Sequence, residues 1–188
     1  MVARSPQPID LVDASARQVR YLRLSVTDRC QYRCQYCLPE KGVRFVPRTE
    51  LLDFDEIERL VRVFVSLGID RVRLTGGEPT LRRGFVDLVS RLSSLEGLKD
   101  LAMTTNAERM VELAKPLRDA GMRRVNISLD TLKADRFKRL TRVDRLKQVF
   151  EGIDATIDAG FESIKVNTVV IRGTNDDELA DLVAFSAE

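Results

Sequence analysis

Residues 21–37 read YLRLSVTDRCQYRCQYC, in which a strand-like run leads directly into a loop that carries every cysteine of the chain. Apolar and polar side chains alternate in residues 21–26, which is the period of a β-strand with one buried face. Cys30, Cys34 and Cys37 follow, four and then three positions apart, so one short loop can bring three thiols to a single inorganic centre. The stretch therefore predicts a strand that ends at a metal or iron-sulfur site.

The number of possible ligands narrows the kind of site. A closed structural zinc site needs four ligands, whereas this chain has three cysteines and no histidine. Zinc would need a further ligand from an aspartate or from a second chain, and that alternative stays open. A four-iron cluster ordinarily takes four cysteines, so three leave one iron with a position for a small molecule. We favour such an open-cornered cluster over zinc, and over a disulfide framework, which an odd number of cysteines suits poorly.

The rest of the chain alternates strand-like and helix-like segments at the spacing of βα units. Helical connections of this kind join parallel strands. The strands are expected at residues 21–26, 71–75, 100–105, 123–129 and 163–171. We expect a single α/β domain over residues 1–188, a partial βα barrel of about five parallel strands with helices outside, with a flexible or extended segment at 1–19.

One face of each expected strand is polar, although parallel strands buried on both faces are usually apolar throughout. An antiparallel sheet with a solvated side would give the same pattern, but the intervening helices argue against it. Arg23, Arg73 and Lys165 share the polar phase with Thr104 and Ser128, so three cations would converge on one cavity. Each cation alone would be an ordinary solvated residue. Together they predict an anionic, phosphorylated ligand in the barrel.

The cysteine spacing resembles that of the radical SAM superfamily, whose enzymes bind S-adenosylmethionine (SAM) at the open iron of a [4Fe-4S] cluster. Further blocks extend the resemblance to the GTP 3′,8-cyclase family of molybdenum cofactor biosynthesis. They are LRLSVTDRCQYRCQYCLPE (22–40), RVRLTGGEPTLRRG (71–84), MTTNA (103–107), RRVNISLDTL (123–132) and KVNTVVIRGTNDDE (165–178). Taken together these blocks are far more specific than Thr-Gly-Gly-Glu-Pro alone, which would indicate only a radical SAM enzyme.

The resemblance implies a role for several residues. Cys30, Cys34 and Cys37 match the cluster ligands. The positions that match SAM contacts are Tyr36, Gly77 and Ser128, with Gly76 and Glu78 beside them; those that match GTP contacts are Arg23, Arg73, Thr104 and Lys165. Glycine would let backbone groups approach SAM closely. The implied reaction starts when a 5′-deoxyadenosyl radical removes a ribose hydrogen from GTP, and it ends with 3′,8-cyclo-GTP; no catalytic side chain is singled out.

Members of this family continue with a further strand and a C-terminal region with a second three-cysteine cluster, which we do not find in the sequence. We therefore expect SAM binding to survive more readily than turnover of GTP. Two alternatives stay open: a metal-binding or iron-sulfur module without catalysis, and a radical SAM enzyme with another substrate, such as a maturase that acts on peptides.

The remaining expectations concern partners and location. The formal net charge is +2, from 31 basic and 29 acidic residues, too balanced to indicate nucleic-acid or membrane-surface binding. The sequence shows neither a signal peptide nor an apolar run long enough to cross a membrane, so we expect a cytoplasmic protein. The resemblance implies GTP as substrate and a reductant protein such as flavodoxin, and a homodimer is conceivable.

Overall fold

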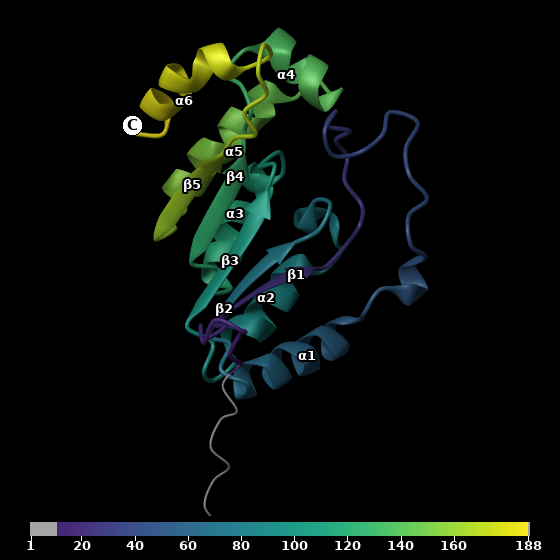
Figure 1. The fold of residues 1–188 in the computed structure, drawn as a ribbon, viewed down its shortest axis with the longest axis vertical. Helices are drawn as coiled ribbons and strands as arrows, with labels where there is room; N and C mark the ends of the chain where they lie inside the picture. Colours follow the sequence, from purple (N-terminus) through teal and green to yellow (C-terminus); the bar gives the residue numbers. More distant parts are fainter. Residues whose placement is uncertain (1–10, 188) are drawn as a thin grey trace, which may run out of the picture.

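The computed structural model describes residues 11–187 and contains one five-stranded sheet in the order β1-β2-β3-β4-β5 (Figure 1). All four pairings between neighbouring strands are parallel. The strands are β1 (Tyr21–Ser25), β2 (Arg71–Thr75), β3 (Asp100–Thr105), β4 (Arg124–Ser128) and β5 (Ser163–Asn167). A sheet in which each strand pairs with the next along the chain is the architecture of an open βα barrel, so the predicted fold class is confirmed.

Helices connect the strands and pack side by side along one face of the sheet, where α1 contacts α2, α2 contacts α3 and α3 contacts α5 (Figure 1). They are α1 (Phe54–Ser66), α2 (Phe85–Ser93), α3 (Met110–Asp119), α4 (Ala134–Thr141), α5 (Leu146–Asp158) and α6 (Leu179–Phe185). Three short 3-10 turns, η1 (Arg48–Glu50), η2 (Pro79–Leu81) and η3 (Asp176–Glu178), complete the connections. No helix in the described part of the chain has the length and apolar character needed to cross a membrane.

The register shows which strand face holds the core. Leu24 pairs with Leu74, Leu74 with Met103 and Met103 with Val125, and of this row Leu74, Met103 and Val125 are fully buried. These side chains belong to the apolar core under the helices. The alternate row contains Thr104, Asn126 and Lys165, which pair across β3, β4 and β5. The expected division into one apolar and one polar face is therefore present in every strand.

The last strand is shorter than the sequence pattern predicted. We expected a strand over 163–171, but β5 ends at Asn167. Beyond it the Thr168 hydroxyl donates to the Leu129 carbonyl at 2.7 Å, and the side-chain amide of Asn175 donates to the Val169 carbonyl at 2.9 Å. These bonds satisfy polar groups that a longer strand would have paired in a ladder, so the ladder ends at Asn167.

The segment before β1 was expected to be flexible or extended over 1–19. Residues 1–10 lie outside the described residues. In the rest of the segment Val12 and Gln18 form an isolated antiparallel bridge, and the side chain of Arg17 donates to Asp13 at 2.8 Å. The described part is thus a small closed turn beside the amino end of β1.

Candidate cluster and cofactor site

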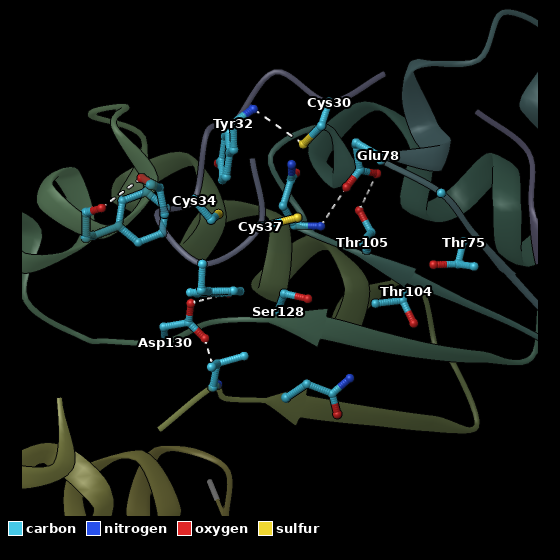
Figure 2. A pocket seen from close by; sticks show the side chains of 18 residues that line it. Cys30, Tyr32, Cys34, Cys37, Thr75, Glu78, Thr104, Thr105, Ser128 and Asp130 are labelled. Atoms are coloured by element: carbon cyan, nitrogen blue, oxygen red, sulfur yellow. Dashed lines mark hydrogen bonds between the residues drawn. The ribbon is translucent and has the colours of Figure 1, made fainter. Parts of the chain in front are cut away.

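A cavity of about 330 Å3 opens at the carboxyl ends of the strands, beneath the cysteine loop (Figure 2). The residues that line the cavity come from three parts of the chain: the cysteine loop, the ends of β2 to β5 with the segments that follow them, and α4. The lining comprises Cys30, Tyr32, Cys34, Tyr36, Cys37, Thr75, Gly76, Gly77, Glu78, Thr104, Thr105, Asn106, Ser128, Asp130, Phe137, Thr141, Asn167 and Val169. The carboxyl end of a barrel is where ligands ordinarily bind in this class of fold. All three cysteines and all five residues predicted to contact SAM are in this set.

The cysteine loop follows β1 and is held in place by α4. The backbone amide of Arg33 donates to the Thr141 carbonyl at 3.0 Å, and that of Gln35 donates to the Leu140 carbonyl at 2.9 Å. The ring of Tyr32 meets the ring of Phe137 edge to face, with centroids 5.9 Å apart. Figure 1 shows this loop reaching from the end of β1 toward α4 before the chain returns to α1. The apolar pattern of the sequence did not predict α4, in which half of the residues are charged and Phe137 and Leu140 are buried.

The thiols lie in an environment that disfavours a bare negative charge. Burial raises the pKa of Cys34 to about 12, and the charge of Asp130 adds to that effect. Burial also raises the pKa of Cys30. Cysteine binds metals as the thiolate, so a cationic centre between the sulfur atoms is needed to deprotonate such thiols at neutral pH. Within residues 11–187, no group of three or more His, Cys, Asp or Glu side chains has the geometry of a single-ion site.

The two glycines that follow β2 are required by the cysteine loop. A Cβ atom on Gly76 would lie 2.2 Å from the Thr27 carbonyl oxygen, and one on Gly77 would lie 2.3 Å from the Arg29 carbonyl oxygen. The backbone amide of Gly77 instead donates to the Thr27 carbonyl at 2.7 Å. The sequence predicted that glycine permits close approach to SAM; the close approach that the structure shows is to the backbone of the cysteine loop.

Glu78 lies at the floor of the cavity and is 1% exposed. Its carboxylate accepts a hydrogen bond from the Thr80 hydroxyl at 2.7 Å. It also accepts from the Thr105 hydroxyl at 2.7 Å and from the backbone amide of Asn106 at 2.8 Å (Figure 2). Burial raises the pKa of Glu78, and these bonds only partly oppose the shift. Because its oxygens are already engaged, the carboxylate fixes the end of β3 against the glycine turn.

Tyr36 is anchored by Asp130, a residue to which the sequence alone assigned no role. The Tyr36 hydroxyl donates to the Asp130 carboxylate at 2.6 Å, and the other carboxylate oxygen accepts from the Val169 amide at 2.9 Å (Figure 2). Burial, followed by this hydrogen bond, raises the pKa of Tyr36. Asp130 stands two positions after Ser128 in the same phase, which was the available signal.

The side-chain amide of Asn106 is a donor in the cavity that has no protein partner among the described residues. The side-chain nitrogen of Asn106 is buried without a hydrogen bond, and the residue is 7% exposed. Its oxygen is fixed by the Glu108 amide at 3.1 Å and by the Gln31 side chain at 3.4 Å. A buried amide donor without a partner is costly, so it indicates a position where a ligand acceptor fits.

The residues predicted to contact GTP separate into two groups. Thr104 lines the cavity, whereas Arg23, Arg73 and Lys165 do not. Arg23 pairs with Arg73, two positions before the Ser25–Thr75 pair at the strand ends, and Lys165 is exposed on β5. Arg73 stacks over the Tyr21 ring at 5.3 Å, and its Nε is buried without a partner. These cations share the polar face with the cavity but lie deeper along the strands.

Comparison with known proteins places this site in a family. A family model described as the radical SAM superfamily matches residues 24–186. The chain is 52% identical over 178 residues to a GTP 3′,8-cyclase of Pseudomonas putida, and 52% identical over 177 residues to a GTP 3′,8-cyclase 1 of Pseudomonas aeruginosa. These matches cover 95% and 94% of this chain but 53% and 54% of the two relatives. The chain thus spans about half the length of the curated relatives it matches.

Solved structures share the fold at low identity. Streptococcus suis SuiB bound to S-adenosylmethionine aligns with a TM-score of 0.68 at 19% identity, covering 89% of this chain and 37% of SuiB. HydG, a maturase of the [FeFe]-hydrogenase, aligns with a TM-score of 0.64 at 17% identity, covering 79% of this chain and 35% of HydG. With a five-stranded parallel sheet, a family match over most of its length and homologues among the GTP 3′,8-cyclases, the chain belongs to the radical SAM superfamily.

Proposed function

We propose that the chain forms the SAM-cleaving part of a GTP 3′,8-cyclase. The observation that carries the proposal is that one cavity collects Cys30, Cys34 and Cys37 together with Tyr36 and Ser128. These residues come from the loop after β1 and from the end of β4, so the fold rather than the local sequence brings them together.

The residues fit a [4Fe-4S] cluster with one open iron. Three soft thiols, of which burial raises the pKa of Cys30 and Cys34, suit a cationic iron-sulfur centre, and the lining offers no histidine. When bound, the cluster and SAM supply the reductive cleavage that generates the 5′-deoxyadenosyl radical. The chain itself holds the loop in place through the glycine turn and α4, and leaves Cys30 and Cys34 only half-exposed.

SAM would occupy the space between the loop and the strand ends. The unpartnered amide of Asn106 offers a hydrogen-bond donor there, and the Ser128 hydroxyl lies on the same wall (Figure 2). Tyr36 is fixed across the opening by Asp130. Gly76 and Gly77 let the cysteine loop lie directly against the backbone that follows β2, which sets the position of the thiols relative to this side of the cavity.

GTP would lie along the deeper polar face, with Thr104 at the boundary of the two ligands. Arg23, Arg73 and Lys165 provide cations there, and the buried Nε of Arg73 has a donor to spare. A triphosphate would supply the oxygen acceptors that these donors need. The proposal further includes, as expected from the sequence, a cytoplasmic location, a reductant protein such as flavodoxin, and a possible homodimer.

Anaerobic reconstitution of the chain with iron and sulfide, followed by chemical reduction and addition of SAM, tests the proposal. We expect release of 5′-deoxyadenosine, and with GTP a GTP-derived product. Cys34→Ala should abolish the release, whereas Ser66→Ala on the outer helix α1 should leave it unchanged. Tetrahedral zinc in place of a cluster would contradict the proposal. Release of 5′-deoxyadenosine without GTP binding would indicate a radical SAM enzyme with another substrate.

A further inference from the structure

A second pocket, of about 200 Å3, lies next to the cysteine loop and is strongly basic. Its lining comprises Thr27, Arg29, Arg48, Leu51, Leu81, Arg82 and Arg83. Four of these seven residues are arginines and none is acidic. The whole chain has a formal net charge of only +2, so this concentration of positive charge is a local feature.

Two of the arginines are fixed by neutral acceptors and aromatic rings. Arg82 donates to the Val26 carbonyl at 2.6 Å and to the Leu52 carbonyl, and it stacks over Phe54 at 4.9 Å. Arg29 likewise donates to a backbone carbonyl and stacks on an aromatic ring. Carbonyls and rings orient a guanidinium without cancelling its charge, so both cations still project a positive field.

The other two arginines are free at the rim. Arg48 and Arg83 are exposed, and within residues 11–187 neither side chain forms a hydrogen bond or an ion pair. None of the described residues that line the pocket is acidic, although the nearby charge of Asp53 acts on Arg82. The pocket therefore keeps unneutralised charge where a partner can reach it.

The position of the pocket relates it to the cluster site. Arg29 immediately precedes Cys30, and consecutive Cα atoms lie about 3.8 Å apart. Thr27, which lines the pocket, accepts the Gly77 amide that braces the loop at 2.7 Å. The basic pocket is thus built on the same segment that presents the first cysteine.

We propose that this arginine pocket is the docking site of an acidic one-electron donor protein. The inference rests on the proposed function, because reductive cleavage of SAM requires one electron for each molecule cleaved. The donor protein would be oxidised by one electron, which would pass to the group bound by Cys30, Cys34 and Cys37. No atom or chemical group is transferred between the two proteins. Exposed rim cations such as Arg48 and Arg83 suit steering of an acidic protein surface more than tight enclosure of a small anion.

The test measures binding apart from turnover. Isothermal titration calorimetry of the chain with a purified flavodoxin of net negative charge gives a Kd at low and at moderate ionic strength. We expect Arg48→Glu with Arg83→Glu to weaken binding at least about tenfold at low ionic strength, and salt to weaken wild-type binding, since the Debye length is about 10 Å at 0.1 M. The neutral pair Arg48→Gln with Arg83→Gln should give a smaller loss.

Two controls keep the result specific. Lys115→Glu with Lys147→Glu makes the same charge change on α3 and α5, far along the chain from the pocket, and should leave the Kd within about twofold. Release of 5′-deoxyadenosine with dithionite, which needs no docking, should be unchanged in the Arg48/Arg83 variants. If dithionite yields no product even in the wild type, the proposed function fails while the calorimetry still decides whether docking occurs.

Several outcomes would overturn the docking proposal. They are no binding of flavodoxin to the wild-type chain, equal weakening by the pocket and the control variants, and loss of dithionite-driven release in the Arg48/Arg83 variants. Saturable binding of inorganic phosphate that these variants abolish, with flavodoxin binding unchanged, would make the pocket a small-anion site instead.

Discussion

The Tyr36 hydroxyl lies 2.6 Å from the Asp130 carboxylate, and this hydrogen bond joins the cysteine loop to the segment that follows β4. Asp130 continues the connection, because it also accepts the Val169 amide beyond β5. The loop that would hold the cluster is therefore not free to move independently of the strands that would hold SAM. Substitutions at either end of this bond should affect ligand binding together.

Tyr36→Phe removes only the hydroxyl and should weaken SAM binding to the reconstituted chain about tenfold, since a hydrogen bond to a charged acceptor contributes about 1.5–3 kcal/mol. Asp130→Asn removes the charge and should weaken binding in the same direction. The double variant should lose less than the sum of the two single losses, because both act on one contact. Equilibrium binding of SAM measures all three; strictly additive losses would contradict the coupling.

Gly77→Ala should prevent the cysteine loop from seating. The added Cβ would meet the Arg29 carbonyl oxygen at 2.3 Å, a backbone atom that can move only with the loop. We expect less than half of the wild-type iron and sulfide content after reconstitution. Gly160→Ala is the matched control, because its Cβ would meet nothing within 4 Å although its φ of +73° makes alanine strained. Equal iron content in the two variants would show that the glycine turn does not support the site.

Two carboxylates in the turn before α6 should make the stability of the folded chain fall at acid pH. Burial acts to raise the pKa of Glu178, but hydrogen bonds from Thr131 and the Leu132 amide, with the charge of Arg136, outweigh it and lower that pKa below its usual value. The hydrogen bond from Arg136, with other interactions of the same sense, lowers the pKa of Asp177 from 3.8 to about 2. A lowered carboxyl pKa contributes stability that is present above the unfolded value and is lost as pH falls through the folded value.

We therefore expect Arg136→Gln to lower the Tm at neutral pH, and its difference from the wild type to shrink as pH falls from about 4.5 toward about 2. Thermal unfolding followed by circular dichroism across this range measures the effect. Arg139→Gln, on the exposed side of the same helix α4, should show little difference at any pH. A difference for Arg136→Gln that stays constant into acid would mean that these carboxylates do not account for it.

Much of the fold could be predicted from the sequence because apolar and polar side chains alternate regularly along the strands. The phase of Leu24, Leu74 and Met103 placed them in the core, and the structure pairs them in one row. Alternation does not show how far along a strand a side chain lies from the cavity at the carboxyl end. Arg23 and Arg73 were correctly placed on the polar face, but they lie two residues before the strand ends, about 7 Å short of the cavity.

The site was predictable where chemistry is local in sequence and less so where tertiary contacts create it. Three closely spaced cysteines indicated a metal site by themselves. The support of the loop by α4 could not be predicted, since that helix is charged on most faces and gives a weak apolar signal. The close approach of Gly77 to the Arg29 carbonyl likewise depends on how the loop after β1 runs beside the turn after β2, which is a tertiary contact.

The electron paramagnetic resonance spectrum of the reduced, reconstituted chain, recorded before and after addition of SAM, tests the central claim most directly. If Cys30, Cys34 and Cys37 hold a four-iron cluster with one iron open to the cavity, the spectrum should be that of a reduced [4Fe-4S] centre, and SAM should shift it. Cys34→Ala should lose the signal. A four-iron signal that SAM leaves unchanged, or the absence of any such signal from the intact chain, would contradict the account.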